Sequence, residues 1–70
     1  MMPIVYASPN EENVIKKVGG NPEVKRHLED LCLTPGAKAV LISKMSGNVI
    51  VKVKESRVAI SEEMARKVMV

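Results

Sequence analysis

The chain has 70 residues and a mass of 7.7 kDa, which allows one small domain over residues 1–70 and excludes a large catalytic scaffold. Hydrophobic residues make up 46% and charged residues 27% of it, a balance that fits neither a disordered tail nor a membrane protein. Residues 1–8 lack the basic start and long apolar core of a signal peptide, and a single cysteine suits a reducing compartment, so we expect a cytoplasmic protein.

The net charge of +3 is unevenly distributed along the chain. Residues 1–36 carry four basic and five acidic groups, residues 37–60 five and one, and residues 61–70 two of each. The positive excess therefore lies in the middle segment. One tyrosine and no phenylalanine or tryptophan are present, so the core must be aliphatic, and the many valines and isoleucines favour strands.

The N-terminal segment is ambiguous. Residues 2–7 could form an edge strand or a loose lead-in. Residues 8–18 begin like a capped helix, with proline at its first position. Residues 14–18, however, are rich in β-branched side chains and run into Gly19-Gly20-Asn21, which fits a strand and a turn. The local pattern leaves helix and strand open.

The next segment predicts a helix. Residues 21–22 are asparagine and proline, which favour a helix cap and the first helical position. Val24, Leu28 and Leu31 then recur at intervals of four and three, which lines one face of a helix about three turns long. Residues 34–36, Thr-Pro-Gly, end it.

The second half of the chain predicts short strands, because the apolar period becomes two. We expect strands over residues 38–44, 48–54 and 57–60 joined by turns at 45–48 and 55–56, a helical turn over 62–64 capped by Ser61, and a final strand over 68–70. The first strand should carry Ala39, Leu41 and Ser43 on one face and Lys38, Val40, Ile42 and Lys44 on the other. Closure of these strands into a small antiparallel barrel would protect their edges.

Catalysis is not expected from this sequence. His27 is the only histidine, and no Ser–His–acid or Cys–His–acid set can be assembled around it. The nearby acids Glu23, Glu29 and Asp30 share the exposed face of the predicted helix and have the pattern of solvated charge.

Two alternative functions remain open. His27 and Cys32 are weak candidates for a divalent transition metal, but a structural zinc site needs four ligands, so we expect no cofactor. The basic residues of the predicted hairpins could attract single-stranded nucleic acid; they are Lys38, Lys44, Lys52, Lys54 and Arg57. These strands carry no aromatic side chain on which bases could stack, so specific nucleic-acid binding is not expected.

The order of motifs from about residue 13 to residue 70 resembles the FeoA family. The motifs are Leu28-Glu29-Asp30-Leu31-Cys32-Leu33-Thr34-Pro35-Gly36, then an alternating strand, Ser46-Gly47-Asn48, a second strand, Val58-Ala59-Ile60, Met64-Ala65 and Val68-Met69-Val70. The resemblance implies an SH3-like barrel with one inserted helix and a short C-terminal helical turn. It also implies that residues 14–18 form a strand.

The resemblance further implies a function by contact. Members of this family are accessory proteins of bacterial ferrous iron uptake, expected to bind the cytosolic GTPase domain of the transporter FeoB at the inner membrane. We expect a monomer or weak dimer that meets this partner through the helix, the turn after it and the hairpin tip. The predicted contact residues are Val24, Lys25, Arg26, Leu28, Leu31, Leu33, Pro35, Gly36 and Met45.

Cys32 departs from the family pattern, which has glycine at that position. Glycine after a helix commonly takes a left-handed conformation that a side chain resists. Either the helix ends differently in this chain, or Cys32 carries about 1 kcal/mol of backbone strain.

Overall fold

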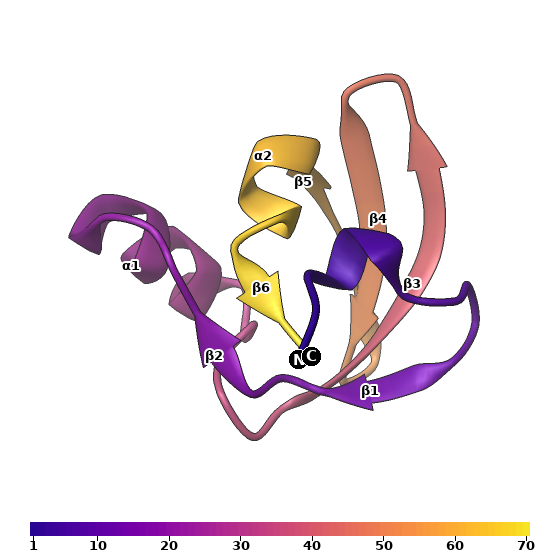
Figure 1. Cartoon of the computed structure of the whole chain (residues 1–70), viewed down its shortest axis with the longest axis horizontal. Helices are drawn as coiled ribbons and strands as arrows, with labels where there is room; N and C mark the ends of the chain where they lie inside the picture. Colours follow the sequence, from indigo (N-terminus) through magenta and orange to yellow (C-terminus); the bar gives the residue numbers. More distant parts are fainter.

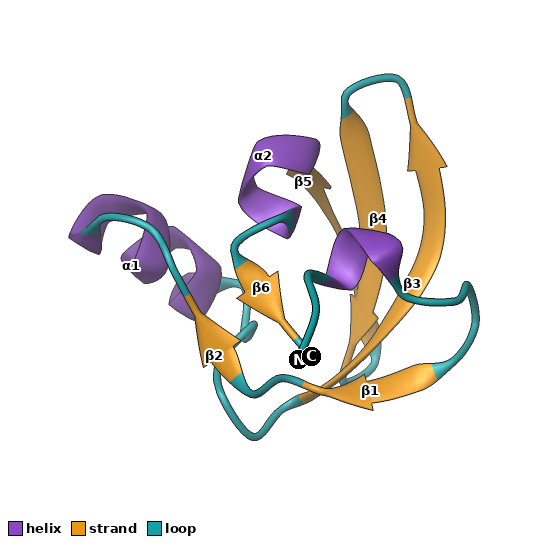
Figure 2. Ribbon diagram, in the orientation of Figure 1, coloured by secondary structure: helices purple, strands orange, loops and turns teal.

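The structure described here is a computed structural model of residues 1–70 (Figures 1 and 2). Its elements in chain order are the 3-10 helix η1 (Ile4–Tyr6), β1 (Glu12–Val14), β2 (Lys17–Val18), α1 (Pro22–Asp30), β3 (Lys38–Met45), β4 (Asn48–Val53), β5 (Ser56–Ser61), α2 (Glu62–Ala65) and β6 (Val68–Met69).

Two antiparallel sheets are joined through consecutive strands. One has the order β1-β3-β4-β5 and the other pairs β2 with β6. Because β1 and β2 follow each other directly in the chain, they connect the two sheets into a small barrel, with α1 projecting at one side (Figure 2). This is the predicted SH3-like architecture, with one inserted helix and a short C-terminal helix.

The two ends of the chain close the barrel side by side (Figure 1). Met2 and Val70 exchange two backbone hydrogen bonds, of 2.8 and 2.7 Å, and Pro3 bridges Met69. Residues 4–6 form a 3-10 turn rather than the edge strand or loose lead-in predicted for residues 2–7, which corrects that prediction. The physical reason is burial, because Ile4 and Val5 are 0% and 1% exposed and belong to the core.

The ambiguous segment before α1 is extended, as the family resemblance implied. Residues 12–14 pair with β3 and residues 17–18 pair with β6. Ile15 lies between the two strands, and its amide and carbonyl bond to Ala37 and Gly36. A helix is excluded there because these backbone groups serve non-local pairing instead of bonds within the segment.

A bulge in β3 overturns part of its predicted face assignment. The pairing with β4 shifts between Leu41 and Ser43, so Ser43 lies opposite Ile50 and Lys44 lies opposite the buried Val49. Lys44 therefore turns to the inner side of the sheet, where its Nζ donates to the carbonyl of Val5 at 3.0 Å. Strict alternation cannot anticipate one extra residue in a strand.

The core is entirely aliphatic, as the composition predicted. All buried residues pack in one cluster and none is polar; they are Ile4, Val5, Ala7, Ile15, Leu28, Leu33, Ala39, Leu41, Val49, Val51, Val53, Ile60, Ala65, Val68 and Val70. The strict alternation predicted for β4 is confirmed, since its three valines all point into the core. None of the helices combines the length and apolar character that a membrane crossing requires.

Candidate protein-contact surface

The predicted surface begins with α1, whose start follows the sequence closely. The Asn21 side chain accepts a hydrogen bond from the Val24 amide at 2.9 Å, and Pro22 occupies the first helical turn. Glu23 lies in that same turn, where a carboxylate favours the helix dipole. These residues fix the orientation of the exposed side chains that follow.

The other end of α1 shows why glycine is the family residue at position 32. Cys32 has a φ of 66°, in the left-handed region, and its amide donates to the Glu29 carbonyl at 2.9 Å. The Leu33 amide donates to the Leu28 carbonyl at 2.9 Å, which completes a Schellman motif. Of the two alternatives stated for this position, the structure therefore has the second: the helix end keeps the left-handed geometry, and Cys32 carries the backbone strain.

Burial divides the apolar residues of the predicted surface into two groups. Leu28 and Leu33 are both 0% exposed and belong to the core cluster, so they cannot reach a partner. Their assignment as contact residues is corrected: they hold the end of α1 on the core. Val24 and Leu31 are half-buried and pack against the core, leaving part of each side chain accessible.

The accessible part of the predicted surface lies on α1 and on the turn that follows it in the chain. Lys25, Arg26, Pro35 and Gly36 are all exposed. Gly36 has a φ of 91°, which a turn of this shape requires of glycine. We call Val24, Lys25, Arg26, Leu31, Pro35 and Gly36 the α1 surface; it combines two basic side chains, partly exposed aliphatic carbon and a turn whose Gly36 amide donates to the Ile15 carbonyl at 2.8 Å.

Met45 is well separated from the α1 surface. It is 65% exposed at the start of the turn between β3 and β4, and Figure 1 shows this turn at the opposite side of the molecule from α1. The structure therefore does not bring all the predicted contact residues together. Contact with both regions requires a partner that spans the molecule.

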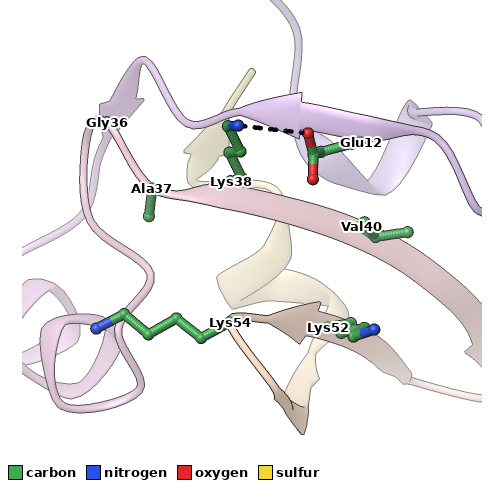
Figure 3. A pocket seen from close by; sticks show the side chains of 7 residues that line it. All are labelled: Glu12, Gly36, Ala37, Lys38, Val40, Lys52 and Lys54. Carbon is green, nitrogen blue, oxygen red and sulfur yellow. Dashed lines mark ion pairs between the residues drawn. The ribbon is translucent and has the colours of Figure 1, made fainter.

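A groove that was not predicted opens on the outer face of the sheet (Figure 3). It has a volume of about 470 Å³ and is lined by Glu12, Gly36, Ala37, Lys38, Val40, Lys52 and Lys54. The alternation of β4 already places Lys52 and Lys54 on one side. What the sequence could not reveal is the pairing of β1 with β3, which brings Glu12 to the same groove.

The weak metal candidates are not assembled into a site. His27 is exposed on α1, and Cys32 is half-buried after its end. No group of three or more His, Cys, Asp or Glu side chains lies close enough together to hold a metal ion. His27 and Cys32 are therefore not part of a cluster of three or more such side chains.

Comparison with known proteins identifies the family. The sequence model described as the FeoA domain matches residues 2–70. The chain belongs to the FeoA family. Among curated relatives of the family, a Methanocaldococcus jannaschii protein named "Putative Fe(2+) transport protein A" is 31% identical over 70 residues, covering 100% of this chain and 85% of its own length.

Solved structures support both the family and its fold. A crystal structure titled as the iron uptake regulatory protein FeoA superposes with a TM-score of 0.85 at 25% identity, over 96% of this chain and 89% of that one. A manganese-dependent transcriptional repressor superposes with a TM-score of 0.82 at 9% identity, over 100% of this chain and 41% of the repressor. The second likeness shows the shared SH3-like fold alone.

Proposed function

We propose that this FeoA-family chain is a non-catalytic accessory protein of ferrous iron transport that acts by contact with the GTPase-containing transporter FeoB. The observation that carries the transport role is the family match over residues 2–70, together with the relative named for Fe(2+) transport. Contact with FeoB is the finer part of the proposal and rests on the family resemblance.

The character of the molecule supports action by contact. All of its buried side chains are aliphatic, so its polar and charged side chains lie at or near the surface, where a partner can reach them. Three surface features are accessible to a partner, namely the α1 surface, the exposed Met45 and the groove on the sheet.

The α1 surface is the part we assign to FeoB. Lys25 and Arg26 project from a helix whose start is capped and whose end is fixed by buried leucines, so the backbone that carries them is ordered before binding. An ordered backbone loses less conformational freedom when a partner binds. Met45 would extend the contact to the other side, where a flexible thioether suits an interface.

Isothermal titration calorimetry with the cytosolic GTPase domain of FeoB from the same organism tests this proposal. The double variant Lys25→Glu with Arg26→Glu should weaken binding by about tenfold or more, because two attractive charges become repulsive. Lys17→Glu is the matched control, since Lys17 is an exposed residue of β2 outside the proposed contact. Equal affinity of the unmodified chain, the double variant and Lys17→Glu would contradict the assignment of the α1 surface to FeoB.

Met45→Glu is a separate test of how far the contact extends. A loss of affinity in this variant, with the fold intact, would indicate a partner that reaches both sides of the molecule. Unchanged affinity would confine the contact to α1 and the turn at Pro35 and Gly36.

A further inference from the structure

The outer face of the large sheet gathers basic side chains from three strands. The strand register places Val40, Lys52 and Arg57 in one row across β3, β4 and β5. Lys38 and Lys54 lie two positions away from this row, on the same face. We call Lys38, Lys52, Lys54 and Arg57 the basic face. It carries most of the positive excess of the middle segment, from which only Lys44 turns to the inner side.

The charge of this face is nearly uncompensated within the molecule. Lys38 Nζ lies 3.9 Å from Glu12 Oε1, and both side chains are more than half exposed, so this pair is weak. The two ion pairs of the structure involve none of Lys52, Lys54 and Arg57. Two carboxylates border the face, Glu12 in β1 and Glu55 in the turn beside Lys54, so the four cations leave a net positive charge that attracts an anionic partner.

The groove of Figure 3 gives this face a shape as well as a charge. Its volume is about 470 Å³, and its aliphatic carbon comes from Ala37 and Val40. In Figure 3 the Lys54 side chain extends along the end of the groove that carries Gly36 and Ala37, while Lys52 and Val40 occupy the other end. A complementary ligand carries a carboxylate for the lysine at each end and aliphatic carbon beside it.

The backbone at Lys54 supplies an independent observation. Its φ is 57°, in a two-residue turn between β4 and β5, and the first position of such turns strongly favours glycine. A lysine there strains the backbone without helping the turn. The turn therefore gives no reason for a lysine at this position. The Lys54 side chain is exposed and lines the groove, which gives it a role outside the turn.

The chemistry of the face selects among possible occupants. The only aromatic residue, Tyr6, lies on η1 and does not line the groove, so bases of a single strand find no stacking platform. A second copy of the chain that presented this same face would be repelled by its positive charges. Carboxylates on an extended polypeptide satisfy the lysines, and its apolar side chains can cover Val40.

We propose that the basic face binds an extended acidic segment of a partner protein, with carboxylates on Lys52 and Lys54 and an aliphatic side chain over Val40. This surface goes beyond the contact assigned to α1, and the two surfaces meet at Gly36. It does not depend on FeoB being the partner. Substitutions at residues 52 and 54 test it, and those at residues 25 and 26 test the α1 surface.

The test is a titration of the full-length, nitrogen-15-labelled chain monitored by amide chemical shifts. The probe is a blocked peptide of alternating glutamate and valine. Three comparison ligands are used at the same ionic strength, namely the peptide with glutamine in place of glutamate, oligothymidine and inorganic phosphate. The glutamate peptide alone should produce saturating shifts, centred on residues 36–40 and 52–57.

Two variants and one control separate binding from stability. Lys54→Gly should weaken peptide binding by about two- to fivefold, as expected for one exposed charge pair, while raising the urea midpoint of unfolding. Lys52→Glu combined with Lys54→Glu should weaken it by about tenfold or more. Lys17→Glu, whose side chain lines a different hollow, should leave the affinity unchanged.

Several results would overturn the proposal. Equal shifts with phosphate would mean general anion attraction, and tighter saturation by oligothymidine would make this a nucleic-acid surface. Absence of shifts on residues 36–40 and 52–57, or equal weakening by Lys17→Glu, would also contradict it.

Discussion

Two regions of the molecule form through different kinds of contact. One is the meander of β3, β4 and β5, and the other is the closing segments at residues 2–18 and 68–70. In the meander, each strand pairs with its neighbour in the sequence through a short turn. In the closing segments, residues from the two ends of the chain meet, as Met2 and Val70 do. Local alternation specifies the first region, whereas the second depends on contacts distant in sequence, so each can be perturbed separately.

The first prediction is that the closing segments contribute as much to the free energy of unfolding as the meander does. Ile4→Ala in η1 should lower the free energy of unfolding by about 3 kcal/mol, because it leaves a cavity at a fully buried position. Leu41→Ala in β3 should cost a similar amount. Urea denaturation measures both, and a loss below about 1 kcal/mol for Ile4→Ala would show that residues 2–7 are only a lead-in.

The second prediction concerns the contact between the two regions. Lys44→Met removes the donor to the Val5 carbonyl and should cost about 1 kcal/mol. Lys52→Met is the matched control, since Lys52 is exposed and makes no side-chain hydrogen bond, and it should change stability by less than about 0.5 kcal/mol. Equal effects of the two substitutions would remove the structural role of Lys44.

The third prediction concerns the backbone strain after α1. Cys32→Gly should be more stable than Cys32→Ala by about 1 kcal/mol, because only glycine adopts the observed φ of 66° without cost. Comparison with alanine is needed because both substitutions remove the half-buried thiol. Thermal unfolding of the two variants measures the difference, and an equal or higher stability of Cys32→Ala would exclude strain at this position.

The smallest expected effect on stability belongs to the α1 surface. Lys25→Glu with Arg26→Glu should lower the free energy of unfolding by less than about 1 kcal/mol, since both side chains are exposed and the new like-charge pairs with Glu29 and Asp30 cost only a few tenths each. Circular dichroism during urea denaturation provides the measurement. A larger loss would mean that any effect on FeoB binding reflects unfolding.

The sequence predicted the elements whose information is local. The Asn21 cap of α1, the Ser61 cap of α2, which accepts from the Met64 amide at 3.1 Å, and the inward valines of β4 all follow from residues close in the chain. The strand at residues 14–18 needed the family resemblance, because its partners lie in β3 and β6. Local patterns do not encode such partners.

The site was predictable only in part, and for the same reason. Exposure of Lys25 and Arg26 follows from the helical period, but the same period could not show that Leu28 is fully buried. The bulge after Leu41 moved Lys44 away from the other basic residues of the hairpins. The distance between Met45 and α1 is likewise a property of the three-dimensional arrangement.

Contact through α1 is tested most directly by a titration of the labelled chain with the cytosolic GTPase domain of FeoB, with and without bound nucleotide. If α1 makes the contact, amide shifts concentrate on residues 24–36 and are lost in the Lys25→Glu, Arg26→Glu variant. Shifts confined to other regions, or none at saturating partner concentration, would contradict contact through α1.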